Sequence, residues 1–310
     1  MNNNLRTGAV ITATNTIQNQ HQISPLTQLG SISVIRRIIL IFQQADISPI
    51  VVITGRQALE IEQHLANYGV IFIRDENYEH TTPMEQAKLG LAFLAEKCSR
   101  LFFTSADIPV FLPGTLRSMK KETGEIIIPT FRKKDGFPVL LSQKTVSDML
   151  AEQHCLTPQE YIARDLPGKK HLESNDKGIF LTADHYERLD PVIAGHNQQL
   201  LHPFVTINIE RDQLFFNSRA KLLLQLVLET HSVQSACKYM AVSKSKAWDM
   251  INQMEAALGF PVVQRRHGGS HGGQTELTAK GRQFLDAYLA YEEKVKRYAS
   301  EQFRKDFPDL

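Results

Sequence analysis

The sequence predicts an α/β domain with a doubly wound, mainly parallel sheet, followed by a smaller α+β domain that ends in a long helix. The chain has 310 residues, about twice the length of a typical domain. Short β-branched runs alternate with helical stretches in the first part, and the later part is mainly helical. We therefore expect one domain over residues 1–190, a linker over 191–217 and a second domain over 218–310.

The expected elements of the first domain follow this alternation in order. Each strand is a run of β-branched and aromatic residues, and each helix has apolar residues at helical spacing. The expected elements are Gly8–Ile11, Val34–Gln44, Ile50–Gly55, Gln57–Tyr68, Val70–Ile73, Met84–Lys97 and Leu101–Thr104. Such alternation is typical of a Rossmann-like parallel sheet covered on both faces. Ligands of such sheets bind beyond the carboxyl ends of the strands.

The composition excludes several classes of protein. Hydrophobic residues make up 42% of the chain and charged residues 22%, which is typical of a folded chain and not of a disordered one. The longest apolar run, near residues 38–42, is far shorter than the roughly 18 residues of a membrane span. The three cysteines are widely spaced and form no disulfide framework or zinc motif. We expect a cytoplasmic protein that does not bind a membrane.

Positive charge is concentrated in the second domain. The whole chain has a net charge of +2, yet residues 219–282 hold nine lysines and arginines against four acids. A basic segment beside a mildly acidic remainder favours an anionic polymer as the partner.

The second domain has the element order of a winged helix-turn-helix. The expected helices are Ser218–Glu229, Ser232–Met240 and Ser243–Leu258. The expected strands of the wing, on either side of a glycine-rich tip, are Pro261–Arg266 and Thr275–Thr278. A small residue in the second helix, Ala236, allows the third helix to pack closely.

The third helix is the expected recognition element. Its first turn carries hydroxyl and lysine side chains, where such a helix meets the major groove and where a helix amino terminus favours phosphate. Basic residues of the wing can neutralise further phosphates. The candidate DNA-contacting residues are Ser243, Lys244, Ser245, Lys246, Arg265, Arg266 and His267. We therefore expect double-stranded DNA as a partner, and the alternative is a solvated basic helix beside an open loop.

A resemblance to a known family supports this interpretation. The segments that carry it are Ser232–Cys237, Ser243–Trp248, Arg265–Gly269, Gly272-Gly273 and Leu277–Gly281. Together they resemble the winged-helix domain of the molybdate-responsive ModE-type regulators, a relative of the LysR class. The resemblance implies a DNA-binding transcriptional regulator linked to molybdenum or its cofactor. No small molybdate-binding β-domain follows the winged helix here, so we do not expect direct oxyanion sensing of that type.

A long helix is expected from Thr278 to about Arg304. Its apolar and aromatic positions step by four and three residues, the spacing of a heptad seam. These positions are Phe284, Tyr288, Tyr291, Val295 and Tyr298. We expect the seam to form a homodimer, because a DNA-binding dimer with two-fold symmetry matches a palindromic DNA site. The alternative is that this face packs on its own domain.

The first domain carries a second resemblance. Its segments are Gly8–Ile11, Pro25, Leu29-Gly30, Asn77–Leu91, Ser105–Pro109, Arg132–Leu140 and Gly178–Leu189. They resemble the molybdenum-cofactor nucleotidyltransferases, particularly the molybdopterin cytidylyltransferase-like group. The resemblance implies a nucleotidyltransferase-like fold and a nucleotide or substrate pocket. The candidate pocket residues are Thr14, Asn15, Ser24, Thr82, Asp107, Gly136 and Phe137.

The loop that would hold a triphosphate lacks the residues this chemistry needs. In the family, a glycine, an arginine and a lysine cradle the phosphates. Asn15, Asn19 and Ser24 stand at these positions. Loss of one preorganised electrostatic partner typically costs about 10²–10³-fold in rate. We therefore assign no catalytic residue and expect an inactive domain that senses a nucleotide or pterin. The alternative is a molybdopterin cytidylyltransferase-like enzyme that transfers a nucleotide from CTP or GTP with Mg²⁺.

Two aspartates are candidate metal ligands. Asp107 matches the family's Asp-x-Pro element, and Asp184 matches the second aspartate of its closing element, in which Thr182 replaces the first. Both would hold Mg²⁺ beside a nucleotide if the site is still occupied. Asp107 is equally well explained as the polar end of a strand.

Overall fold

The computed structural model of the protein describes residues 6–14, 24–183, 186–266 and 274–307. The chain divides into two compact units, residues 1–61 with 70–200 and residues 62–69 with 201–310. We call residues 1–200 the sheet domain and residues 201–310 the winged domain. The limits 1–190, 191–217 and 218–310 remain a prediction.

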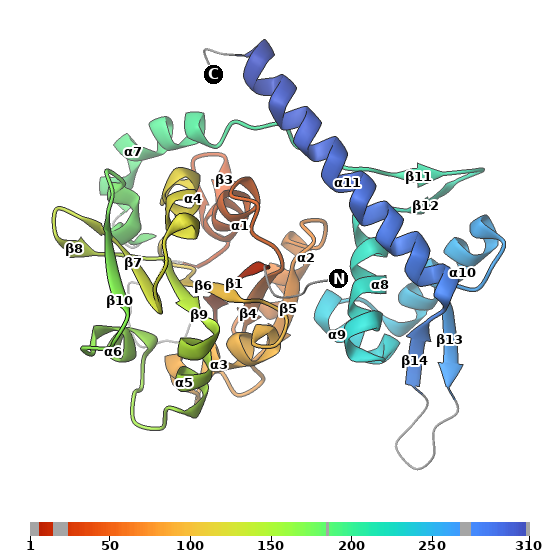
Figure 1. Ribbon diagram of the computed structural model, residues 1–310, viewed down its shortest axis with the longest axis horizontal. Helices are drawn as coiled ribbons and strands as arrows, with labels where there is room; N and C mark the ends of the chain where they lie inside the picture. Colours follow the sequence, from red (N-terminus) through yellow and green to blue (C-terminus); the bar gives the residue numbers. More distant parts are fainter. Residues whose placement is uncertain (1–5, 15–23, 184–185, 267–273, 308–310) are drawn as a thin grey trace. The chain divides into compact units, whose positions relative to one another are not determined.

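The sheet domain is built on one eight-stranded sheet with helices on both faces (Figure 1). The strand order is β10-β7-β9-β6-β1-β4-β5, and β8 pairs with β7. The bounds are β1 Thr7–Ala13, β4 Ile50–Thr54, β5 Ile71–Arg74, β6 Arg100–Ser105, β7 Ile126–Phe131, β8 Lys134–Asp135, β9 Val139–Ser142 and β10 Lys169–Glu173. The long strands are parallel to one another except β9, which is antiparallel to β6 and β7. The predicted mainly parallel sheet is confirmed.

The remaining elements of the sheet domain connect and cover these strands. Their bounds are β2 Gln28–Leu29, β3 Ile32–Ser33, α1 Val34–Gln44, α2 Ala58–His64, α3 Pro83–Leu94, α4 Pro113–Lys121, α5 Gln143–Ala151, α6 Pro158–Ala163 and α7 Tyr186–Gln199. Every residue of β4 is buried, because helices cover both faces, and its sequence is accordingly an apolar run without alternation.

The packing of α3 on β1 places side chains at the edge of the sheet. Thr82 caps α3 and forms a reciprocal capping box with Glu85. A Cβ added to Gly90 would lie 2.5 Å from a methyl carbon of Val10, so only glycine allows this close approach of helix and strand. One turn before Gly90, the buried Gln86 lies on the same helix, at the end of β1.

Helix α7 overlaps the beginning of the predicted linker. Pro191 and Gly195 suggested irregular chain there, but the helix continues to Gln199. Ile193, His196 and Leu200 are all buried, at spacings of three and four residues. Tertiary packing of this face therefore outweighs the weak local helix propensity.

The winged domain has the predicted helix-turn-helix and wing. Its bounds are β11 Ile209–Glu210, β12 Leu214–Phe216, α8 Ser218–Thr230, α9 Val233–Met240, α10 Lys244–Leu258, β13 Val263–Arg266, β14 Gln274–Leu277 and α11 Ala279–Asp306. No helix in the described segments has a stretch long and apolar enough to cross a bilayer.

The predicted seam of α11 is divided between two environments. The ring of Phe216 lies 4.9 Å from that of Phe284 and 4.7 Å from that of Tyr288, so these two seam residues pack on their own domain. Farther along the helix, Tyr291 is 57% exposed and Tyr298 64% exposed. For Phe284 and Tyr288 the alternative therefore holds, because this part of the seam packs on β12 of its own domain. Dimerisation through the outer part of the seam remains a prediction.

Candidate nucleic-acid interface and candidate ligand site

The first turn of α10 faces solvent. Ser243 caps the helix by accepting a hydrogen bond from the backbone N–H of Lys246 at 3.2 Å. The side chains of Ser243, Lys244, Ser245 and Lys246 are exposed, and the first turn contains no acid. The amino-terminal dipole and two lysines thus combine in one place.

The opposite face of α10 is fixed in the domain core. Ala247, Ile251 and Met254 are fully buried, at spacings of four and three residues. The preceding turn is tight, since Ala241 has a φ of 51°. The fully buried Ala236 confirms the expected close packing of the second helix. The arrangement leaves the basic first turn available to a groove of DNA.

The two strands of the wing connect α10 to α11. Strands β13 and β14 are antiparallel, with Val263 opposite Leu277 and Arg266 opposite Gln274. Arg265 and Arg266 belong to β13, and His267 and the rest of the tip, up to residue 273, lie outside the described residues. A Cβ on Gly281 would lie 2.3 Å from a backbone oxygen, so the base of the wing packs directly on α11.

At the carboxyl edge of the sheet, Thr14 begins a chain of buried and partly buried hydrogen bonds. Its hydroxyl donates to Oε1 of Gln86 at 2.6 Å. Nε2 of Gln86 donates to the hydroxyl of Thr81 at 3.1 Å, and that hydroxyl donates to the carboxylate of Asp75. The chain joins the ends of β1 and β5 through α3, so these polar groups satisfy one another.

Sequence reasoning identified Thr14 but missed its partners Gln86, Thr81 and Asp75. One signal was available for the aspartate. Asp75 directly follows β5, much as Asp107 closely follows β6, and the carboxyl ends of the parallel strands of one sheet lie at the same edge.

Asp107 lies at this edge beside the end of β1. Its carboxylate accepts a hydrogen bond from the hydroxyl of Ser105, and its backbone oxygen accepts one from the N–H of Ala183 at 2.7 Å. Asp184 follows Ala183 and lies outside the described residues, as does Asn15. In the described segments no three His, Cys, Asp or Glu side chains gather as a metal site. Magnesium binding by Asp107 and Asp184 remains a prediction.

The other candidate pocket residues have structural partners. Ser24 donates from its hydroxyl to Oε1 of Gln57 at 2.8 Å. Phe137 packs edge-on against Phe103 of β6, with the ring centres 6.3 Å apart. A Cβ on Gly136 would lie 2.5 Å from Ile179, so this position needs glycine. Thr82, as described above, caps α3. Thr14 and Asp107 therefore closely follow two neighbouring strands, β1 and β6, whereas Ser24, Thr82, Gly136 and Phe137 belong to other segments.

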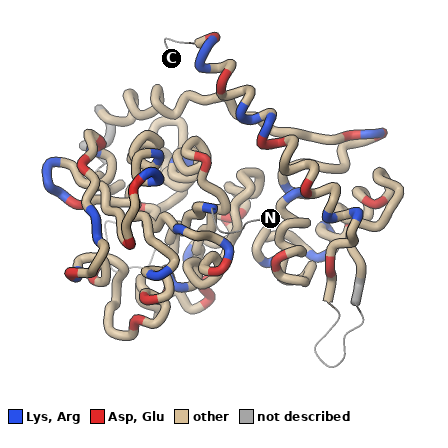
Figure 2. The backbone as a smooth tube through the Cα atoms, viewed as in Figure 1, with Lys and Arg blue, Asp and Glu red and all other residues tan. Residues whose placement is uncertain are grey.

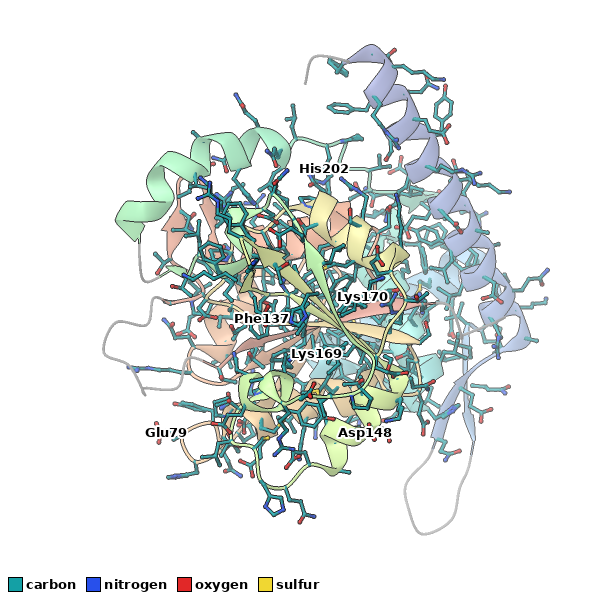
Figure 3. The ribbon with its side chains drawn as sticks, turned by 60° about the vertical axis from the view of Figure 1, so that its left-hand side comes forward. Glu79, Phe137, Asp148, Lys169, Lys170 and His202 are labelled. Carbon is teal, nitrogen blue, oxygen red and sulfur yellow. The ribbon has the colours of Figure 1, made fainter. Side chains whose placement is uncertain are left out.

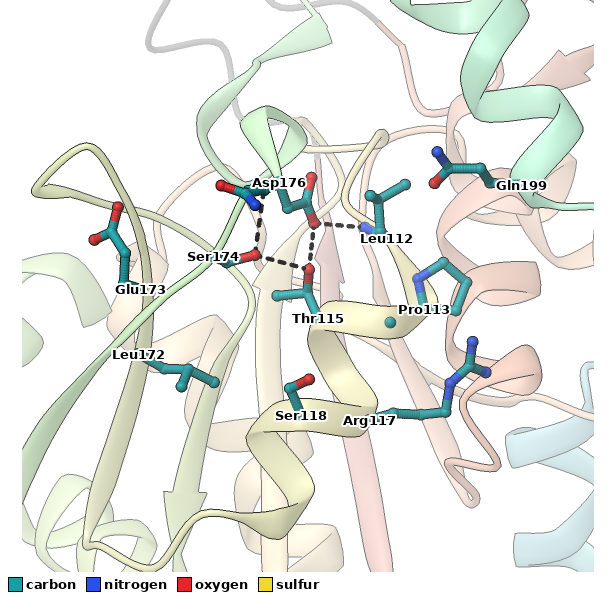
Figure 4. Close-up of a pocket in the computed structure, with 12 residues that line it drawn as sticks. Leu112, Pro113, Thr115, Arg117, Ser118, Leu172, Glu173, Ser174, Asp176 and Gln199 are labelled. Atoms are coloured by element: carbon teal, nitrogen blue, oxygen red, sulfur yellow. Dashed lines mark hydrogen bonds between the residues drawn. The ribbon is translucent and has the colours of Figure 1, made fainter.

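An open groove of about 570 Å³ lies at the amino terminus of α4 (Figure 4). The carboxylate of Asp176 accepts hydrogen bonds from the N–H of Leu112 and the hydroxyl of Thr115, both at 2.7 Å, and from the N–H of Gly178 at 2.8 Å. Burial raises the pKa of Asp176, and these three hydrogen bonds oppose the rise. The protein's own carboxylate thus accepts hydrogen bonds from donors at the start of α4.

The two domains define the class of protein: a nucleotidyltransferase-type sheet domain joined to a winged helix-turn-helix domain. Residues 24–167 match the MobA-like NTP transferase domain, and residues 220–282 match the bacterial regulatory helix-turn-helix proteins of the lysR family. The chain therefore carries both of these domains, as the two resemblances predicted. The transferase match begins at residue 24, so it leaves out Asn15 and Asn19 of the altered loop and includes Ser24.

Curated relatives match the helix-turn-helix region. The transcriptional regulator ModE of Yersinia pestis is 31% identical over 84 residues, which cover 27% of this chain and 32% of the relative. The molybdenum transport protein ModE of Azotobacter vinelandii is 37% identical over 70 residues, which cover 23% of this chain and 26% of the relative. The chain thus spans about a third or less of the length of these relatives.

A solved structure supports the fold of the sheet domain. A nucleotidyl transferase from Methanothermobacter superposes with a TM-score of 0.51 and 17% identity, covering 63% of this chain and 98% of that protein. At this identity the likeness concerns the fold alone.

Proposed function

We propose that the protein is a dimeric, DNA-binding transcriptional regulator linked to molybdenum or molybdenum-cofactor metabolism. The observation that carries this proposal is the first turn of α10, where Ser243, Lys244, Ser245 and Lys246 are exposed above a buried face. Relatives named as a transcriptional regulator and as a molybdenum transport protein support the link to molybdenum.

In this proposal the sheet domain senses a ligand and does not catalyse transfer. Asn15, Asn19 and Ser24 replace the glycine and the two cations that a triphosphate requires. The hydrogen bond between Thr14 and Gln86 supports the absence of transfer at this edge, because it engages polar groups within the protein. A nucleotide or a pterin is the proposed ligand, and binding would alter regulation only if its affinity differs between the free and DNA-bound protein.

The dimer surface in this proposal is the outer part of α11. Tyr291 and Tyr298 are exposed there, seven residues apart, with the partly exposed Val295 between them. Seven-residue spacing brings side chains to the same face of a helix, as in a coiled-coil seam.

DNA binding is tested by fluorescence anisotropy with genomic fragments at physiological salt. The paired substitution Lys244→Ala/Lys246→Ala should weaken binding at least tenfold, because it removes two phosphate contacts. Lys294→Ala/Lys305→Ala removes the same charge from exposed positions of α11 and serves as the matched control. Equal losses in both variants, or no binding by the native protein, would contradict the proposal.

The match of residues 24–167 to the transferase domain favours a second candidate, transfer of a nucleotide from CTP or GTP onto molybdopterin with Mg²⁺. Asp107 is at the position such an enzyme would use for the metal. Pyrophosphate release with molybdopterin, Mg²⁺ and either nucleotide would support it, and its absence with both would remove it.

A further inference from the structure

The β7–β8 hairpin of the sheet domain presents three consecutive cations. Arg132, Lys133 and Lys134 are exposed at its end, and the hairpin projects from the sheet (Figures 1 and 2). Arg132 has a φ of 51° and Lys133 a φ of 65°. Two consecutive positive φ values are those of a type I′ turn, which favours Asn-Gly. The hairpin thus holds long cationic side chains at positions where the backbone alone would favour small residues.

The carboxylate nearest the turn binds its backbone. Glu173 accepts hydrogen bonds from the hydroxyl of Thr130 and from the backbone N–H of Arg132, both at 2.8 Å. These two hydrogen bonds, together with a weaker effect of Lys133, hold the pKa of Glu173 below its usual value. Glu173 therefore fixes the turn through its backbone, and its contact with Arg132 does not use the guanidinium.

Aromatic rings support two of the cations. The guanidinium of Arg132 lies 5.3 Å from the ring centre of Phe131, and the ammonium of Lys134 lies 5.2 Å from that of Phe180. The two rings are themselves 6.0 Å apart. Cation–π contacts position a charge without neutralising it.

The acids around the hairpin have other partners. Among the described residues no ion pair within 4.0 Å involves Arg132, Lys133 or Lys134. A carboxylate oxygen of Asp135 lies 3.4 Å from Nε2 of His171. The edge strand β10 also carries Lys169 and Lys170 (Figure 3), but they lie opposite Ile126 and Ile127 at the other end of β7, away from the hairpin, and Lys170 pairs with Glu122. The positive charges of the hairpin are therefore not neutralised by ion pairs within the described residues.

The shape of this surface indicates which class of anion it can bind. Small ligands bind in concave sites that enclose most of their surface. Exposed side chains at the end of a projecting hairpin suit an extended polyanion, whose phosphates pass along a surface.

We propose that the β7–β8 hairpin is a second DNA-backbone contact, through which Arg132, Lys133 and Lys134 of the sheet domain bind phosphates of duplex DNA. This inference rests on the proposed function, because DNA is the polyanion that the winged domain would bind.

The test replaces the two turn residues with those that the turn conformation favours, in the variant Arg132→Asn/Lys133→Gly. Because Asn-Gly favours a type I′ turn, the hairpin should remain folded while two cations are removed. We expect the slope of log K against log salt for duplex DNA to become shallower by about two. Lys121→Ala/Lys144→Ala, at exposed positions of α4 and α5, removes the same charge and should leave the slope unchanged.

The outcomes separate this inference from the proposed function. One outcome is that Lys244→Ala/Lys246→Ala makes the slope of log K against log salt shallower and Arg132→Asn/Lys133→Gly leaves it unchanged. The hairpin then does not contact DNA, and the proposed function still holds. Equal effects of the hairpin variant and the Lys121/Lys144 control would also overturn the inference. Loss of a tripolyphosphate-induced thermal shift with an unchanged DNA slope would assign the hairpin to a small phosphorylated ligand instead. If the native protein binds no DNA, the proposed function fails and this inference fails with it.

Discussion

Thr14, at the end of β1, donates a 2.6 Å hydrogen bond to the side-chain oxygen of Gln86 in α3. Both side chains are buried, and the chain continues through Thr81 to Asp75. These four polar side chains at the carboxyl edge of the sheet therefore have internal partners.

Removing one partner of these internal hydrogen bonds should lower the stability of the protein. Thr14→Val leaves Oε1 of Gln86 buried without its donor and should lower the free energy of unfolding by about 1–3 kcal/mol. Urea denaturation measures the change. Thr14→Ser, which keeps the hydroxyl, is the matched control and should cost less. Equal costs for the two variants would show that the hydrogen bond contributes nothing.

The altered loop predicts the absence of nucleotidyl transfer. With Mg²⁺, molybdopterin and either CTP or GTP, pyrophosphate release should stay at the background rate, because neither Asn19 nor Ser24 can neutralise the leaving group. A coupled pyrophosphate assay measures this. Turnover that disappears on Asp107→Asn would identify an active site and contradict the account.

The buried pair Arg37 and His196 predicts acid sensitivity. Nδ1 of His196 lies 3.0 Å from a guanidinium nitrogen of Arg37. Burial, and to a smaller extent the charge of Arg37, lower the pKa of His196 from 6.5 to about 4, although its hydrogen bond to the backbone oxygen of Phe111 opposes the shift. The unfolded chain therefore takes up a proton near pH 6.5 and the folded chain only near pH 4.

As the pH falls from 6.5 to 4, the free energy of unfolding should decrease by about 3 kcal/mol through His196 alone. Urea titrations across this range measure the loss. His196→Gln should flatten the dependence, while His154→Gln, at an exposed position, should not. An unchanged pH profile in His196→Gln would contradict this explanation.

The exposed seam of α11 predicts the oligomeric state. Tyr291→Glu/Tyr298→Glu should convert a dimer to a monomer, because charges on an apolar seam oppose its burial. Light scattering after size-exclusion chromatography measures the mass. Lys294→Glu, on the same helix, is the control for added negative charge. Equal masses for the native protein and the double variant would exclude this seam as the dimer contact.

Local patterns predicted much of the architecture. The β-branched runs around Val10, Val51 and Phe102 are strands, and Ser232 and Ser243 cap helices as expected. Capping and apolar spacing are properties of neighbouring residues, so they can be interpreted without a structure.

Contacts between distant residues could not be predicted in this way. Thr14 and Gln86 are 72 positions apart, and no periodicity connects them. The same holds for Phe216, whose ring packs against Phe284 and Tyr288 of α11. The antiparallel direction of β9 also depends on its partners, since a strand's sequence does not specify its orientation.

The account depends most directly on sequence-specific binding of DNA by α10. The decisive measurement is selection of bound fragments from genomic DNA at physiological salt, with the native protein and with Lys244→Ala/Lys246→Ala. The account predicts a small set of fragments enriched by the native protein and lost in the variant. Failure of the native protein to enrich any fragment above non-specific binding would contradict it.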